Sequence, residues 1–271
     1  MRHSTYGIKR KGDIYPLLLR LSRISGSRPE NKLLAHEQNT LLASLETLSE
    51  LPPSSVQSIL PLVYYNIKST GMWDQIDPHM KDLLKQNALT LIGSELLKEH
   101  LFNQIIERFK QHDLPVILLK GAAFSENLYR KEAPRVGGDI DLLVKKQDFE
   151  HTCGLLAKWM DPVLLGEERR ATHDVLFERV FRHKKHEGLI VEIHRALTNP
   201  YIFNIEESEL WQASRVDPRV STNLVRILSP EDTLLHLAVH AFRDLDFCTH
   251  NILDAHEVWH QWQPDPELLV E

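Results

Sequence analysis

Apolar residues recur at helical spacing between about residues 13 and 110 of the chain. The leucine-rich helical period is broken at residues 25–29 and 51–55, where Ser and Pro gather. The segment Met80–His112 has the period of one long helix packed on a core, with apolar positions at Leu83, Leu84, Leu89, Leu91, Ile92, Leu96, Leu97, Leu101, Ile105, Ile106 and Phe109. Residues 1–110 are therefore expected to form a helical N-terminal region.

Between residues 111 and 200 the pattern changes to short apolar runs rich in β-branched residues. These runs predict strands at 114–119, at 140–144, near 175–182 and at 189–194. Helical segments are expected between them at 122–129 and 146–160. Residues 111–200 are thus expected to form an α/β core, a small mixed sheet with flanking helices.

From about Ser208 the pattern is helical again, and residues 201–271 are expected to form a helical C-terminal region. A strong helix start lies at Ser229 as N-cap, with Pro230 at the first helical position and Asp232 at the third. The fold class expected for the whole chain is α+β.

The expected strand at 140–144 is preceded by a Gly-Gly turn and carries an Asp-x-Asp motif. Side chains alternate across a strand, so Asp139 and Asp141 share one face while Ile140, Leu142 and Val144 share the other. Two carboxylates this close repel each other unless a cation or a proton lies between them. The motif predicts a site for Mg²⁺, and the alternative is a pair of solvated acids after a turn.

A second carboxylate lies inside an apolar strand. In the run at 189–194, Val191 and Ile193 share one face, which leaves Glu192 and His194 on the other. A carboxylate in so apolar a strand is costly to bury unless it is paired or binds a metal. If the chain returns this strand beside the first, Asp139, Asp141 and Glu192 converge and can hold two metal ions for phosphoryl or nucleotidyl transfer.

Composition limits the function without naming it. The 271 residues are 42% hydrophobic and 26% charged, as in ordinary globular proteins. The net charge of −6 argues against broad affinity for nucleic acid. With two cysteines and neither a signal sequence nor a membrane-spanning run, the sequence predicts a cytoplasmic protein that needs no membrane.

Several separated motifs occur in the order of a known family. They are Leu119-Lys120-Gly121, Arg135, Gly138-Asp139-Ile140-Asp141-Leu142-Leu143-Val144, Val191-Glu192-Ile193-His194 and the segment Leu228–His240. In these motifs the chain resembles the polymerase-β-like nucleotidyltransferase superfamily, and within it the uncharacterised nucleotidyltransferases. The resemblance spans about residues 90–260, and it is specific because the order of the motifs matches.

The resemblance implies transfer of a nucleoside monophosphate from an NTP, with ATP as the default, and release of pyrophosphate. It implies Mg²⁺ or Mn²⁺ as the cofactor, held by Asp139, Asp141 and Glu192, which are also the catalytic residues. The residues that it places around the nucleotide are Lys120, Gly121, Ala122, Arg135, Gly138 and His194. The chain departs from the superfamily pattern at Ala122, where a second Gly or a Ser is usual, so phosphate contacts there must come from backbone N–H groups.

Some of these residues also have simpler interpretations. Lys120 can be a solvated strand end, Arg135 can pair with an acid, and His194 can be a satisfied buried histidine. The acceptor is not identified by the sequence; a small molecule, peptide or protein is favoured over RNA because the chain is acidic.

Two further functions stay open. One is a catalytically silent nucleotide-binding or interaction protein with the same fold. The other is a metal-dependent hydrolase that uses the C-terminal histidines, because His236 and His240 lie one helical turn apart.

Overall fold

The computed structural model describes residues 59–69, 71–125, 127–129, 135–163, 177–200, 203, 205–244 and 249–269, with the backbone alone for 242–244 and 249. The helices expected before residue 59 lie outside these ranges, as do the first two residues of the strand expected near 175–182. The division into regions 1–110, 111–200 and 201–271 stays a prediction.

The described residues contain one mixed sheet of seven strands in the order β3-β4-β5-β2-β1-β7-β6. The strands are β1 (Val116–Leu118), β2 (Ile140–Val144), β3 (Met160–Pro162), β4 (Glu178–His183), β5 (Ile190–His194), β6 (Arg215–Val216) and β7 (Val225–Ile227). In the middle of the sheet, β2 pairs antiparallel with β1 and parallel with β5. The expectation of an α+β fold with a small mixed sheet is confirmed.

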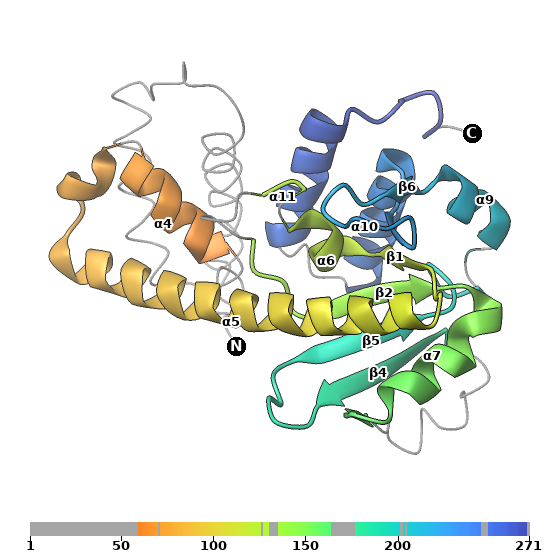
Figure 1. Ribbon diagram of the computed structural model, residues 1–271. Helices are drawn as coiled ribbons and strands as arrows, with labels where there is room; N and C mark the ends of the chain where they lie inside the picture. Colours follow the sequence, from red (N-terminus) through yellow and green to blue (C-terminus); the bar gives the residue numbers. More distant parts are fainter. Residues whose placement is uncertain are drawn as a thin grey trace, which may run out of the picture.

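Helices lie on both sides of this sheet (Figure 1). The helical elements are α4 (Leu60–Ser69), η2 (Met72–Gln75), α5 (Pro78–Gln111), α6 (Lys120–Phe124), η3 (Lys146–Asp148), α7 (Phe149–Leu156), α9 (Glu207–Ala213), α10 (Pro230–Asp244), α11 (Thr249–Glu257) and η4 (Val258–Trp262). No helix among the described residues is both long and apolar enough to cross a membrane.

The two faces of the sheet differ in chemistry because its side chains alternate. One face is the main core: Leu118, Leu142 and Ile193 are buried there with residues of α5 and α7. Figure 1 shows α5 crossing the sheet beside α7. The opposite face carries Asp141 and Glu192 together with a smaller apolar cluster, so the carboxylates lie on the face that the main core leaves free.

The long helix α5 begins two residues before the expected Met80. The Asp77 side chain accepts hydrogen bonds from the backbone N–H groups of His79 (2.8 Å) and Met80 (3.3 Å), which caps the helix start. Four leucines of the predicted core pattern are in fact exposed by 38–54%: Leu83, Leu89, Leu96 and Leu97. The correction has a geometric reason, because a helix presents one stripe to a core and the leucines of this segment lie all round it.

The C-terminal part begins its main helix as predicted. The Ser229 hydroxyl accepts a hydrogen bond from the backbone N–H of Asp232 (3.0 Å) and donates one to its carboxylate (2.7 Å). The structure adds β3, β6 and β7, which the hydrophobic pattern did not indicate. Strands of two or three residues are too short to show a period, and β7 is recognisable only by its parallel pairing with β1.

Candidate metal and nucleotide site

Two neighbouring parallel strands bring the predicted carboxylates together. Asp141 of β2 lies directly beside Glu192 of β5 in the sheet register. His194, two residues further along β5, points to the same face. Ligand atoms of Asp141, Glu192 and His194 all lie within 4.8 Å of one another, so these three side chains form a group that can hold a metal ion.

Asp139 lies just before β2, half-buried, and outside the group of three. Burial raises the pKa of Asp139 to about 6, and the negative charges of Glu192 and Asp141 add to the rise. The site therefore holds the three predicted carboxylates close enough to repel one another, which a bound cation would relieve. The three side chains that lie within 4.8 Å of one another are, however, Asp141, Glu192 and His194, whereas the sequence predicted Asp139 as the third metal ligand.

Lys120 extends from the end of β1 to the carboxylates. Its ammonium Nζ lies 3.4 Å from Asp141 Oδ1. Burial opposes ionisation of Asp141, but the positive charges of Lys120 and His194 outweigh it and hold the pKa of Asp141 well below its usual range. The backbone of Lys120 has a φ of 21°, which is rare outside glycine, and such conformations gather at functional sites.

His194 is a fully buried member of the carboxylate cluster. Its Nε2 lies 3.4 Å from Asp141 Oδ1 and 3.5 Å from Glu192 Oε2, and its Nδ1 lies 3.6 Å from Glu178 Oε2. Burial opposes protonation of this ring, but contact with the acids outweighs it and raises the pKa of His194 to about 9. The side chain thus lies among acids of the site, and a contact with the nucleotide stays a prediction.

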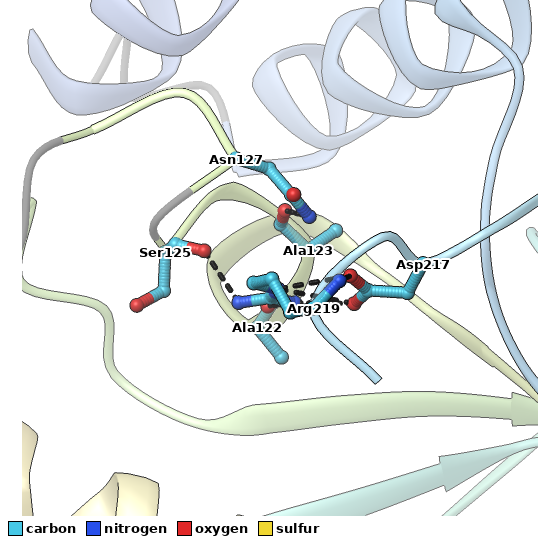
Figure 2. Close-up of polar contacts among 6 residues, drawn as sticks. All are labelled: Ala122, Ala123, Ser125, Asn127, Asp217 and Arg219. Carbon is cyan, nitrogen blue, oxygen red and sulfur yellow. Dashed lines mark hydrogen bonds and ion pairs between the residues drawn. The ribbon is translucent and has the colours of Figure 1, made fainter. Parts of the chain in front are cut away.

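The helix α6 carries the Gly121-Ala122 pair and is fastened at its other end by Arg219 (Figure 2). The Arg219 guanidinium donates to the backbone carbonyls of Ala122 (2.9 Å) and Ser125, and it pairs with the fully buried Asp217 at 2.6 Å. Cations at the C-terminal end of a helix satisfy its last carbonyls. Arg219 therefore fixes the position of α6 next to the carboxylates.

Arg135 is buried in an ion pair and does not face open space. Its guanidinium donates two hydrogen bonds to the carboxylate of Asp254 on α11, from Nε (3.2 Å) and from Nη2 (2.6 Å). The Tyr129 hydroxyl donates to the same carboxylate at 2.7 Å. A side chain added at Gly137 would come within 3.0 Å of Arg135. Arg135 thus holds the loop before Asp139, and of the interpretations left open the structure supports pairing with an acid, here a buried one.

Lys98 of α5 supports the same loop at Gly137, close to Arg135. Its ammonium donates to the backbone carbonyl of Gly137 and pairs with Glu95. A small cavity of about 180 Å³ lies between α5 and α6 and reaches Asp139 and Gly121. The exposed Gly138 beside it has room for a side chain, so its predicted nucleotide contact rests on position alone.

Sequence reasoning missed several residues that complete this site: Lys98, Glu178, Asp217, Arg219 and Asp254. Each is a single charged residue outside any motif, and Arg219 and Asp254 meet their partners across more than 90 residues. A charged residue within an apolar segment was the available signal for Lys98 and Asp254, but it does not name a partner.

His236 of α10 lies close to the cluster on the same side. Burial lowers its pKa well below the usual value, and the nearby His240 and Lys120 add to this effect. Its ring centre lies 4.7 Å from that of His240. In the part of the chain that the structure describes, the C-terminal histidines belong to no group of three metal ligands, so the hydrolase alternative gains no support from them.

We expect affinity for Mn²⁺ or Mg²⁺ to rise as the pH increases from 5 to 7. Because the pKa of Asp139 is raised to about 6, this carboxyl is protonated at pH 5, and the proton competes with the metal. The proton of Asp139 alone should make the dissociation constant fall by about tenfold over this range, and a proton displaced from His194 would add to the fall, as measured by isothermal titration calorimetry. Asp139→Asn should bind more weakly at pH 7 with a shallower pH dependence. Equal affinities of the wild type at pH 5 and 7 would contradict this prediction.

The carboxylates thus lie on one face of two adjacent central strands, β2 and β5, beside the short helix α6 that follows β1. The chain belongs to a family of uncharacterised nucleotidyltransferases, whose model matches residues 54–271. The family named by the sequence motifs is thereby confirmed. A comparison with curated proteins finds no match to this chain.

Proposed function

We propose that the protein transfers a nucleoside monophosphate, AMP from ATP by default, to an acceptor hydroxyl in a reaction that depends on Mg²⁺ or Mn²⁺. The observation that carries this proposal is the pairing of Asp141 with Glu192 across parallel strands, with Asp139 and Lys120 beside them. The predicted cytoplasmic location and the preference for a small-molecule or peptide acceptor over RNA stay predictions.

The donor atoms fit a divalent cation. Asp141 Oδ1 is buried without a hydrogen-bond partner, and Glu192 and His194 offer further ligand atoms within 4.8 Å. Carboxylate oxygens suit Mg²⁺ and Mn²⁺. Because the pKa of His194 is raised to about 9, its ring must lose a proton before a nitrogen can bind the metal. A divalent cation at this place supplies charge stabilisation to a transferring phosphoryl group.

The side chains of the site divide the remaining work. Lys120 provides a positive charge for the phosphates beside Asp141. Glu192 is only half-buried, so its carboxylate can reach the acceptor hydroxyl and take its proton. The acceptor oxygen forms a bond to the α-phosphorus as the bond from this phosphorus to the bridging oxygen breaks. Pyrophosphate leaves with that electron pair.

The proposal is tested by incubating the protein with ATP, GTP, CTP or UTP in turn, labelled at the α- or γ-phosphate, with Mg²⁺ or Mn²⁺ and a cell extract. We expect α-label in a new product and γ-label in pyrophosphate for one nucleotide. A protein that binds the nucleotide but releases no pyrophosphate would be the catalytically silent alternative. Release of inorganic phosphate instead of pyrophosphate would contradict nucleotidyl transfer.

A further inference from the structure

A second and larger cavity lies on the face of the sheet that carries the carboxylates. Its volume is about 590 Å³, within the range of about 300–1,000 Å³ typical of ligand-binding cavities. The cavity beside α6 is much smaller, at about 180 Å³. The larger one is enclosed by β2, the segment after β5 and α9.

This cavity begins next to the metal-binding group. Leu143, which lines it, follows Asp141 by two residues on β2 and so lies about 7 Å further along the same face. Leu143 pairs in register with His194, and Ala196, another lining residue, follows His194 by two positions. The cavity therefore continues the site from the C-terminal ends of the two parallel strands.

Lys120 lies at the opposite end of the same group. Because β1 runs antiparallel to β2, its last residue, Leu118, pairs with Leu142, and the backbone N–H of Leu119 donates to the carbonyl of Asp141 at 3.0 Å. Along β2, the Lys120 ammonium and the cavity thus flank the carboxylates from two sides.

In phosphoryl transfer the attacking and leaving oxygens lie on opposite sides of the phosphorus. Lys120, whose ammonium lies 3.4 Å from Asp141, favours pyrophosphate on its own side of the carboxylates. Lys146 and Arg195 line the cavity, further from the carboxylates, and the cavity side is left for the attacking oxygen. We propose that this cavity binds the acceptor, and that the acceptor is a hydroxyl-bearing molecule with an apolar or aromatic body. This inference rests on the proposed function and names its substrate class.

The residues that line the cavity indicate this class of acceptor. The buried side chains of Leu143, Leu197 and Leu210 form an apolar floor. Phe177 and Phe203 add aromatic surface, and the Phe203 side chain is 40% exposed, so it has apolar area left to cover. The rest of the lining includes the charged or polar residues Lys146, Arg195, Thr198, Glu206 and Glu207. The cavity thus offers an apolar floor to an apolar body and polar groups to the hydroxyls that the same molecule carries.

The acceptor hydroxyl then extends from the end of the cavity at Leu143 toward Asp141 and Glu192, which do not themselves line the cavity. Its oxygen bonds to the α-phosphorus, its proton passes to the Glu192 carboxylate, and the bond to the pyrophosphate oxygen breaks with its electron pair. No further reactant is needed, because the NTP supplies both the transferred group and the leaving group.

The test fills the cavity with a bulky side chain. In Ala196→Trp the indole occupies it, and Ala213→Trp, at an exposed position of α9, is the matched control. Phe203→Ala removes exposed aromatic surface without touching the core, so it keeps the test valid if Ala196→Trp fails to fold. Each variant receives α-labelled ATP, Mn²⁺ and either phenyl or methyl β-D-glucoside, which carry the same hydroxyls and differ in their apolar body.

We expect label on the phenyl glucoside and not on the methyl glucoside. Transfer should fall at least tenfold in Ala196→Trp and several-fold in Phe203→Ala, and stay unchanged in Ala213→Trp, while all bind Mn–ATP as the wild type does. Loss of Mn–ATP affinity in Ala196→Trp would instead place the nucleoside in the cavity and overturn the proposal. Transfer by Ala196→Trp at the wild-type rate would overturn the proposal as well. So would a wild-type protein that binds Mn–ATP but labels both glucosides or neither of them.

A failure of the proposed function gives a different result. If the wild-type protein neither binds Mn–ATP nor releases pyrophosphate, it is not a nucleotidyltransferase, and the cavity does not bind an acceptor. The fluorescence of 8-anilinonaphthalene-1-sulfonate then still shows whether the cavity takes an aromatic body. This probe should bind the wild type and Ala213→Trp alike, and at least tenfold more weakly to Ala196→Trp.

Discussion

Asp141→Asn is expected to lower the rate of nucleotidyl transfer by at least about 10³-fold while the protein stays folded. Asp141 is the one carboxylate that contacts Lys120, His194 and the strand of Glu192 at once, so its charge organises the whole group. Asn keeps the shape of the side chain and removes the charge that a cation requires. The measurement is pyrophosphate release with the acceptor present, together with circular dichroism.

The control is Asp161→Asn, the same substitution at an exposed position of β3 whose ion pair with Lys184 spans 4.0 Å. This variant should transfer at the wild-type rate, because a surface pair contributes little. Asp139→Asn and Glu192→Gln should lose nucleotidyl-transfer activity, as Asp141→Asn does. Full activity of Asp139→Asn and Asp141→Asn would show that the two-metal mechanism is wrong.

Asp254→Ala is expected to lower the free energy of unfolding by about 3–5 kcal/mol, the usual cost of breaking a buried ion pair. The Arg135 and Asp254 side chains are only 5% and 0% exposed. The substitution leaves the guanidinium buried without a counter-charge, and the Tyr129 hydroxyl loses its acceptor. The melting temperature should drop by roughly 6–20 °C, which differential scanning calorimetry measures.

Glu150→Ala provides the comparison, because it deletes the carboxylate of an ion pair with Arg179 in which Glu150 is 74% exposed. We expect a change within about 1 kcal/mol for this surface pair. The double variant Arg135→Met/Asp254→Leu should recover much of the lost stability, since it removes both charges together. A loss below about 1 kcal/mol in Asp254→Ala would refute the role of this pair.

The face on which the carboxylates lie could be predicted from the sequence alone. Alternation in a strand puts Asp139 and Asp141 opposite Ile140 and Leu142 whatever the neighbouring strands are. The start of α10 was predictable for a similar reason, because capping by Ser229 is a contact between residues three apart. Such patterns are local, and tertiary context left them unchanged.

The partners of the charged residues could not be predicted in this way. Arg135 and Asp254 are 119 residues apart, and Lys98 meets Gly137 across 39 residues. No local period or motif relates such positions. The exposed leucines of α5 show the same limit, since a helix with leucines all round it does not reveal which stripe the sheet covers.

The sequence by itself determined the strands β1, β2, β4 and β5, the face that holds the acids and, through its ordered motifs, the nucleotidyltransferase family. Only the tertiary structure decided that β5 lies parallel beside β2, so that Glu192 meets Asp141 and His194 completes the group. It also decided where charge is buried, and hence why the pKa of Asp139 rises while that of Asp141 falls. Strand pairing and burial arise from contacts between distant segments, which a local pattern does not contain.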